Sequence, residues 1–300
     1  MIQLPPSPLQ LIDDPLLKDY SVKLYIKRDD LIHPEITGNK WRKLKYNLIE
    51  AREKGFKSLM TFGGAFSNHI YATSAAGKEF GFETTGIIRG EELTPTSNEI
   101  LMFSKINGMN LIFLPRLNYS FKDKIARQYK DDFYVIPEGG SNEFAIKGVV
   151  EMMDEIYAEI TPDVVCVAAG TGGTLAGIVV GLRGETKALG FAVLKDKGLM
   201  YNFVSKLLTE EREFDITNDY IFNNYGRTTP ELIEFIMEFE KRNPTIKLEQ
   251  VYTGKMMFGV YDMIQKGKFK AGTTICVIHT GGLRGRMKEL GEIFPSSSIL

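Results

Sequence analysis

Short apolar segments and longer amphipathic segments alternate along nearly the whole chain, and this alternation restricts the possible folds more than any other feature. Residues 40–54 illustrate the helical type, because their apolar residues fall on one face and Gly55 follows as a suitable terminator. The pattern predicts strands at 58–62, 84–88, 111–114, 133–136, 163–168, 188–194 and 274–278, and helices at 40–54, 69–80, 97–107, 121–129, 142–160, 174–182, 199–208, 230–241 and 255–265. Helices of roughly 10 or more residues between successive strands indicate parallel sheets with right-handed crossovers. The expected fold class is therefore α/β.

The composition places the chain among ordinary globular proteins. Its 300 residues suffice for one large domain or two medium ones. A net charge of −1 gives no attraction to nucleic acid or to an anionic membrane, and no apolar run reaches the roughly 18 residues of a membrane span. No signal-peptide pattern is visible, so a cytoplasmic location is expected. Cys166 and Cys276 lie in apolar runs and are expected to be buried thiols, and the three histidines match no metal motif.

Lys40 stands in the segment 37–44, which follows a loop and opens a predicted helix. Lys40, Arg42, Lys43 and Lys45 crowd the first turns of this helix, where cations oppose the helix dipole. A local rule that is broken without structural gain is a pointer to function. A lysine can form a covalent bond with a cofactor aldehyde and later carry a proton. The alternative is an ordinary surface lysine at the start of a helix.

A glycine-rich turn, Gly170-Thr171-Gly172-Gly173-Thr174, connects a predicted strand with a predicted helix. Backbone N–H groups in such a turn converge on one anion, and the helix N-terminus adds partial positive charge. No lysine follows as in a Walker A loop, and Leu175 stands where a dinucleotide fingerprint needs glycine or alanine. The turn suits a single phosphate monoester, although the same glycines would also make a tight turn without a ligand.

A second strand-to-helix turn, Gly63-Gly64-Ala65-Phe66-Ser67-Asn68-His69, presents polar groups to a small ligand. Its N–H groups and the Ser67 hydroxyl can bind a substrate carboxylate. Asn68 can donate to a phenolate oxygen on a cofactor ring, and His69 can lie against that ring. The alternative is a simple turn in which Ser67 or Asn68 caps the helix. A covalent lysine, a carboxylate-sized loop and a phosphate-sized loop are together what a pyridoxal phosphate site needs.

Five motifs occur in an order that resembles a known family. They are Gly38-Asn39-Lys40 with Arg42-Lys43-Leu44, the Gly63 to His69 turn, the Gly170 to Thr174 turn, Val251-Tyr252-Thr253-Gly254-Lys255, and His279-Thr280-Gly281-Gly282. The chain is similar, from about Leu24 to Gly282, to the 1-aminocyclopropane-1-carboxylate deaminase / D-cysteine desulfhydrase family. That family belongs to the tryptophan-synthase-β-like, fold type II pyridoxal phosphate enzymes.

The resemblance implies two doubly wound parallel-sheet domains around a cleft. Residues 1–50 plus 156–300 would form the larger, cofactor-binding domain. Residues 51–155 would form the smaller domain, which carries the substrate-carboxylate loop and can close on substrate. A homodimer is expected from the family and from the general prevalence of twofold oligomers.

The resemblance also implies roles for individual residues. Lys40 looks like the lysine that binds pyridoxal 5'-phosphate and carries the proton, and Tyr252 looks like an active-site tyrosine, with a core aromatic as the alternative. Thr280 would face the pyridine nitrogen. The Gly170 to Thr174 turn would hold the phosphate. Catalytic roles would fall to Lys40, Ser67 and Tyr252, cofactor contacts would include Asn68, and Ser67, Asn68 and His69 would bind substrate.

The chain departs from the family in three places. No tyrosine follows Gly282, whereas the cyclopropane deaminases use a second tyrosine there, which favours a D-cysteine desulfhydrase-like elimination over ring opening. Thr280 also resembles the desulfhydrase branch, because the deaminases tend to carry leucine. Trp41 occupies a site often held by a small residue, so it either narrows the pocket or packs on the helix.

Three functional hypotheses stay open at this point. The first is a lyase that converts D-cysteine to pyruvate, ammonia and sulfide, with 1-aminocyclopropane-1-carboxylate deamination as its alternative. The second is a family member with a dicarboxylic or larger substrate, read by Arg284 or Arg286, because arginine binds carboxylates bidentately. The third is a non-catalytic, pyridoxal phosphate-binding homologue.

Overall fold

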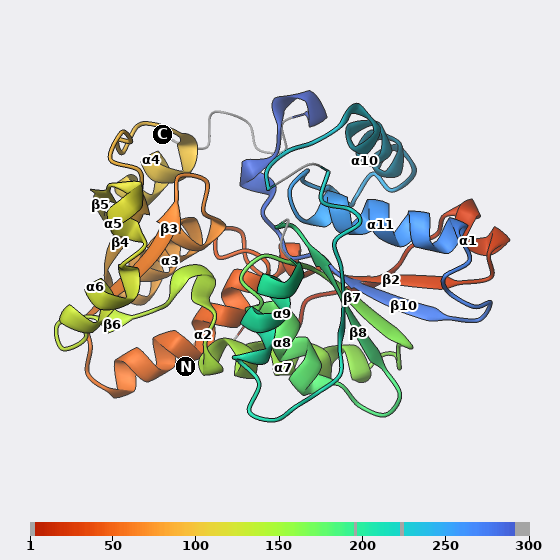
Figure 1. Ribbon diagram of the computed structural model, residues 1–300, viewed down its shortest axis with the longest axis horizontal. Coiled ribbons are helices and arrows are strands. Elements are labelled where there is room, and N and C mark those ends of the chain that lie inside the picture. Colours follow the sequence, from red (N-terminus) through yellow and green to blue (C-terminus); the bar gives the residue numbers. More distant parts are fainter. Residues whose placement is uncertain (1–3, 195–196, 223–224, 292–300) are drawn as a thin grey trace.

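Two sheets lie side by side in the computed structural model, which describes residues 4–194, 197–222 and 225–291 (Figure 1). The larger sheet has six strands in the order β1-β2-β10-β7-β8-β9, and the smaller has four in the order β5-β4-β3-β6. Neighbouring strands are parallel, except that β1 runs antiparallel to β2. The predicted α/β class with parallel sheets is confirmed.

The bounds of the elements follow the chain. The strands are β1 (Leu9–Leu11), β2 (Lys23–Lys27), β3 (Ser58–Gly64), β4 (Glu83–Arg89), β5 (Asn110–Leu114), β6 (Tyr134–Val135), β7 (Val164–Ala169), β8 (Lys187–Ala192), β9 (Asp215–Thr217) and β10 (Thr274–Ile278). The α-helices are α1 (Pro15–Asp19), α2 (Asn39–Glu53), α3 (Asn68–Phe80), α4 (Glu99–Ile106), α5 (Arg116–Tyr119), α6 (Lys122–Gln128), α7 (Glu143–Tyr157), α8 (Gly173–Gly181), α9 (Lys197–Ser205), α10 (Pro230–Arg242) and α11 (Thr253–Gln265).

Each predicted strand and helix has a counterpart within a few residues, but three strands of the large sheet, β1, β2 and β9, were not predicted. Strands β1 and β9 contain three residues each, which is too short for a period-two pattern. Strand β2 ends in Lys27, a residue that looks solvent-exposed in sequence. The Lys27 side chain is fully buried, and its Nζ lies 2.6 Å from a Glu155 carboxylate oxygen. The charged Lys27 made β2 look exposed in the sequence, although its ion pair with Glu155 allows the strand to be buried.

Helix α7 packs between α2 and α8, and a close backbone approach fixes this arrangement. Gly148, a weak point of the helix by propensity, faces α2. A Cβ built on Gly148 would lie 1.9 Å from the carbonyl oxygen of Arg42. A buried ion-pair network joins the same helices, because the Arg42 guanidinium contacts Asp29 at 2.9 Å and Glu155 at 2.7 Å. These contacts fix the start of α2, where Lys40 lies.

Replacing Gly148 with alanine should destabilise the protein by about 2 kcal/mol or more, because the α2 backbone must move to admit a methyl group. Denaturant unfolding of the two proteins measures this difference. Gly285→Ala is the matched control, since nothing lies within 4 Å of a Cβ built there. Equal stability of Gly148→Ala and wild type would show that the helices can separate freely.

The carboxyl ends of three strands bring the sequence motifs together. Strand β3 leads into the Ser67 loop, β7 into the Gly170–Thr174 loop, and β10 into Thr280. Ligands of parallel sheets bind at this edge. The small sheet lies within residues 58–135, and we propose that it and its helices form the predicted smaller domain. No helix among the described residues combines the length and apolar character needed to cross a bilayer.

Candidate active site

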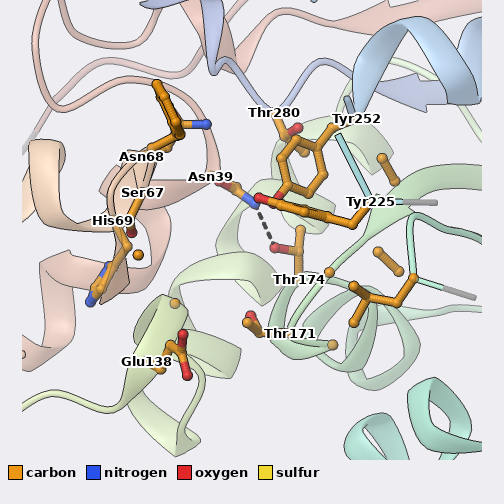
Figure 2. Close-up of a pocket in the computed structure, with 18 of the residues that line it drawn as sticks. Asn39, Ser67, Asn68, His69, Glu138, Thr171, Thr174, Tyr225, Tyr252 and Thr280 are labelled. Carbon is orange, nitrogen blue, oxygen red and sulfur yellow. Dashed lines mark hydrogen bonds between the residues drawn. The ribbon is translucent and has the colours of Figure 1, made fainter. Parts of the chain in front are cut away.

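One cavity of about 630 Å³ collects the predicted site residues from both sheets. In Figure 2, Ser67 and His69 lie on one side, and Thr174, Tyr252 and Thr280 lie opposite. Predicted residues that line the cavity are Lys40, Ser67, Asn68, His69, Gly170, Thr171, Gly172, Thr174, Tyr252 and Thr280. Gly173 is not among the lining residues, but it is the first residue of α8 and adjoins them. The structure therefore brings residues from position 40 to position 280 into one site.

The Gly170–Thr174 loop has the geometry of an anion site. It ends at α8, whose first N–H groups have no partner within the helix. The Asn39 side-chain amide donates to the Thr174 hydroxyl oxygen at 2.9 Å, which leaves the hydroxyl proton available to a ligand. These donors fit a phosphate ester, as the sequence predicted. The Asn39 bond also ties the residue before Lys40 to this loop.

Lys43 lines the cavity as well, although the sequence assigned it no role of its own. Its side chain is 2% exposed, and its Nζ lies 3.0 Å from the Gly139 carbonyl oxygen and 3.4 Å from the Thr171 hydroxyl. Burial, and next the nearby Lys40 charge, hold the pKa of Lys43 well below its usual value. Among the described residues no carboxylate pairs with it. A buried amine beside an anion loop is a suitable counterion for a phosphate.

Lys40 lines the cavity at the first turn of α2. Its backbone is fixed from the other side of the cleft, because Gly38 adopts φ +64° and packs against the Thr280 carbonyl group. A Cβ at Gly38 would lie 2.0 Å from that oxygen, so only glycine fits. Burial lowers the pKa of Lys40 to about 8. A sizeable fraction of the amine is therefore neutral near neutral pH, as covalent chemistry with an aldehyde requires.

Cofactor incorporation into the apoprotein should become faster with rising pH up to about 8 and then level off, because only neutral Lys40 reacts. The rate should rise roughly fivefold between pH 7 and pH 8, because the neutral fraction of an amine with this pKa rises by that factor. An ordinary lysine would give a rise that continues to about 10.4. Stopped-flow absorbance between pH 7 and 10 measures this profile. A rise that continues through pH 10 would contradict the depressed pKa.

The Ser67 loop caps a helix and also lines the cavity. The Ser67 hydroxyl oxygen accepts the Ile70 N–H at 3.2 Å, so the capping alternative raised by the sequence is real. The N–H groups of Asn68 and His69 stand in the first turn of α3 and have no partner within the helix. The Asn68 amide reaches across the cleft, since a Cβ on Gly282 would lie 2.9 Å from its nitrogen. Capping and carboxylate binding are therefore compatible.

His69 is a neutral imidazole with a defined tautomer. The Thr61 hydroxyl donates its one proton to the Ile136 carbonyl at 2.9 Å, so the 2.8 Å contact to His69 Nε2 requires that Nε2 carries the proton. Nδ1 is then an acceptor, and it is buried without a hydrogen-bond partner among the described residues. Burial, and then the charges of the nearby lysines, hold the His69 pKa well below its usual value.

Two tyrosines meet in the cavity, one predicted and one missed. The Tyr252 and Tyr225 hydroxyls lie 3.0 Å apart, and both residues line the cavity (Figure 2). Buried Glu249 holds Tyr252 by accepting its backbone N–H at 2.9 Å. Lys255 Nζ donates to the Ile221 carbonyl at 2.7 Å, close to the turn that carries Tyr225. A second tyrosine hydroxyl therefore lies beside Tyr252, and it comes from a part of the chain other than the segment after Gly282.

Other side chains raised by the sequence lie outside the cavity. Trp41 is 2% exposed and packs against Phe80, so it fills the core and does not narrow the pocket. Arg286 is bound to Glu240, and Arg284 lies over the Tyr71 ring, 5.6 Å from its centroid. Neither arginine is among the cavity-lining residues, so the structure gives no support to the hypothesis that they read the substrate. The predicted buried thiols are confirmed, because Cys166 and Cys276 are buried and free.

Comparison with known proteins agrees with this site. The chain matches the model of the pyridoxal-phosphate dependent enzyme family over residues 3–281. A Pyrococcus horikoshii protein, provisionally named a 1-aminocyclopropane-1-carboxylate deaminase, is 33% identical over 93% of this chain and 90% of its own length. The mitochondrial bifunctional D-cysteine desulfhydrase/1-aminocyclopropane-1-carboxylate deaminase of Arabidopsis thaliana is 32% identical over 96% of this chain and 79% of its own length.

A solved structure supports the same relationship. The crystal structure of an ACC deaminase homologue (ACC is 1-aminocyclopropane-1-carboxylate) is 32% identical and covers 93% of this chain and 90% of its own. Its TM-score of 0.80 shows that the folds agree over that length. The family and the cofactor expected from the five motifs are thus confirmed. The chain belongs to the 1-aminocyclopropane-1-carboxylate deaminase / D-cysteine desulfhydrase family of fold type II, pyridoxal phosphate-dependent enzymes.

Proposed function

We propose that this enzyme removes a β-substituent and the amino group from a small amino acid, with D-cysteine as the leading candidate. The products would be pyruvate, ammonia and sulfide. One observation carries the proposal: a single cavity is lined by Lys40, the Ser67 loop and the Gly170–Thr174 loop. Bound pyridoxal phosphate would supply the electron sink that acidifies the substrate Cα–H bond. The remaining chemistry belongs to the side chains of this chain.

Binding groups would hold the two anionic ends. Lys43, the Thr174 hydroxyl and the N-terminus of α8 suit the cofactor phosphate. The N-terminus of α3 with Ser67 suits the substrate carboxylate, and Asn68 suits the cofactor ring hydroxyl. Thr280 offers a neutral hydroxyl to the pyridine nitrogen. Without a carboxylate there, the nitrogen stays largely unprotonated, which favours β-elimination over transamination.

Proton transfer would be divided between an amine and a phenol. Lys40 has a pKa of about 8, so its neutral form can accept the Cα proton at neutral pH. Burial, with Tyr225 and Glu249 as smaller contributors, raises the pKa of Tyr252 well above its usual value. Tyr252 therefore stays protonated and is suited to donate a hydrogen bond or a proton to the departing group.

Tyr252→Phe should lower kcat by about 10²- to 10³-fold while the cofactor still binds, because the change removes only the proton donor. Steady-state kinetics and the cofactor absorbance measure the two effects separately. Tyr220→Phe is the matched control, since its hydroxyl binds Asp262 at 2.7 Å and Tyr220 is not a lining residue. Unchanged kcat in Tyr252→Phe would remove this residue from the mechanism.

Ring opening of 1-aminocyclopropane-1-carboxylate is the second candidate, and the tyrosine pair favours it. The sequence argument against ring opening rested on a missing tyrosine after Gly282, and Tyr225 supplies a second hydroxyl next to Tyr252. Thr280 still points to the desulfhydrase branch. Product analysis decides between them, because D-cysteine gives pyruvate with sulfide, whereas the cyclopropane gives 2-oxobutanoate. Absence of both products, with cofactor bound, would favour an unlike substrate or the non-catalytic homologue.

Assembly and location complete the proposal. A homodimer follows from the family and from the prevalence of twofold oligomers, and light scattering tests it. A cytoplasmic location is part of the same proposal, and cell fractionation tests it.

A further inference from the structure

Arg89 is a cation in the cavity wall that the proposed reaction does not use. It is the last residue of β4, lines the cavity and is exposed. The other lining arginine, Arg116, is held in an ion pair with Glu92. Within the described part of the chain, no carboxylate forms an ion pair or hydrogen bond with Arg89. Its guanidinium lies over the Tyr119 ring, 5.7 Å from the centroid, which orients it without neutralising it.

The guanidinium stands beside the substrate side of the cavity. Arg89 pairs with Gly64 in the register of β3 and β4, and Gly64 opens the Ser67 loop. A Cβ built on Gly64 would lie 3.5 Å from Arg89 Nη2. Arg89 is thus next to the loop proposed to bind the substrate. A cation at this place would stand beside a substrate held by that loop.

The substrate α-carboxylate already has its own donors. The Asn68 and His69 N–H groups at the start of α3 have no partner within the helix, and the helix dipole adds positive charge there. Arg89 lies on a different strand and leaves a second positive site in the same cavity. Leu93 follows four residues later, lines the cavity and offers an apolar surface to a short aliphatic linker.

We propose that Arg89 selects substrates whose β-substituent ends in a second acidic group, such as a carboxylate. This inference rests on the proposed β-elimination and names its substrate class. In the reaction, Cα loses its proton to Lys40, the electron pair forms the Cα–Cβ double bond, and the Cβ–S bond breaks. The acidic thiolate leaves and takes up a proton. Addition of water then gives pyruvate and ammonia.

A pair of isosteric substrates tests the charge alone. S-carboxymethylcysteine carries the second acid, and S-carbamoylmethylcysteine replaces it with a neutral amide of nearly equal size. Both enantiomers of each are assayed with the cofactor-loaded enzyme for pyruvate release, and each is titrated against the cofactor absorbance. We expect wild type to prefer the acid. Arg89→Gln should lower kcat/KM for the acid by roughly 10- to 100-fold and leave kcat/KM for the amide nearly unchanged, so that the preference falls by the same factor.

Two further variants separate charge from structure. Arg89→Lys should recover part of the preference, because it keeps the charge and loses the bidentate geometry. Arg116→Gln is the matched control, an arginine of the same cavity that is already paired, and it should leave the acid-to-amide ratio nearly unchanged. Equal loss for acid and amide in Arg89→Gln would overturn the proposal and assign Arg89 to the α-carboxylate. Unchanged kcat/KM for both substrates would overturn it as well.

The spectral titration keeps this inference distinct from the proposed reaction. If wild type binds cofactor but releases pyruvate from no amino acid, the proposed elimination fails. The ratio of the dissociation constants of the acid and the amide then still measures whether Arg89 recognises the second acidic group. A preference for the acid that disappears in Arg89→Gln supports the inference under that outcome, and equal binding of both ligands overturns it.

Discussion

Lys40→Ala should bind no pyridoxal phosphate covalently and should lose at least roughly 10³-fold in turnover, which is about 4 kcal/mol of barrier. The reason is that Lys40 is expected both to bind the cofactor aldehyde and to move the Cα proton. The visible absorbance band of the reconstituted enzyme and the rate of 2-oxoacid release measure the two losses. No other change in the chain should have as large an effect.

A neighbouring lysine provides the control. Lys45 lies on the same helix, and its Nζ is bound to the Glu151 carboxylate at 2.7 Å, outside the cavity. Lys45→Ala should therefore keep the band and most of the activity. Circular dichroism confirms that both variants fold. A Lys40→Ala protein that still shows the band and turns over substrate would contradict the assignment of Lys40.

Lys43→Met should weaken cofactor binding by about 10- to 100-fold, because it removes a buried charge-assisted contact to the phosphate. The same substitution should reduce the stability of the apoprotein far less, because burial makes the charged amine unfavourable when no phosphate is present. The neutral oxygens of Gly139 and Thr171 contact the Lys43 amine and offset only part of the free-energy cost of burying its charge. The measurable result is a smaller difference in Tm between holoenzyme and apoenzyme at fixed cofactor concentration.

The pH dependence of apoprotein stability gives a second readout for Lys43. Its pKa in the folded protein lies well below the unfolded value, so the unfolded chain binds more protons between the two values. Stability therefore rises with pH through that window. Lys43→Met should flatten this rise. The same slope in variant and wild type, together with unchanged cofactor affinity, would show that Lys43 does not serve the phosphate.

The sequence predicted well which loops line the cavity where a motif is local. The Gly170–Thr174 and Ser67 loops each lie within one strand-to-helix turn, so spacing alone placed them. Arg42, Lys43 and Lys45 were recognised only as cations that oppose the dipole of α2. Arg42 and Lys45 pair with carboxylates on α7, and Lys43 contacts Thr171. These partners on α7 and in the phosphate loop lie more than 100 residues away, so no local pattern could assign them.

Tyr225 and Arg89 were not predicted as cavity residues for a related reason. Tyr225 meets Tyr252 through a hydroxyl contact between a turn and the start of α11, and the sequence offered no spacing rule for that pair. Arg89 is the last residue of a strand whose sequence predicts burial. Its place beside the Ser67 loop follows only from its pairing with Gly64 of the neighbouring strand. The expected arginines, Arg284 and Arg286, follow a motif in sequence but point to Tyr71 and Glu240 in space. Sheet register and helix crossings decided these outcomes.

The most direct test of the account is the absorbance spectrum of the purified protein during cofactor reconstitution and titration with D-cysteine, L-cysteine, D-serine and 1-aminocyclopropane-1-carboxylate. We expect a visible band that requires Lys40 and that shifts with D-cysteine as sulfide and pyruvate appear in equal amounts. If complete reconstitution gives no band, and Lys40→Ala behaves like wild type, the assignment of this cavity as a pyridoxal phosphate site is contradicted.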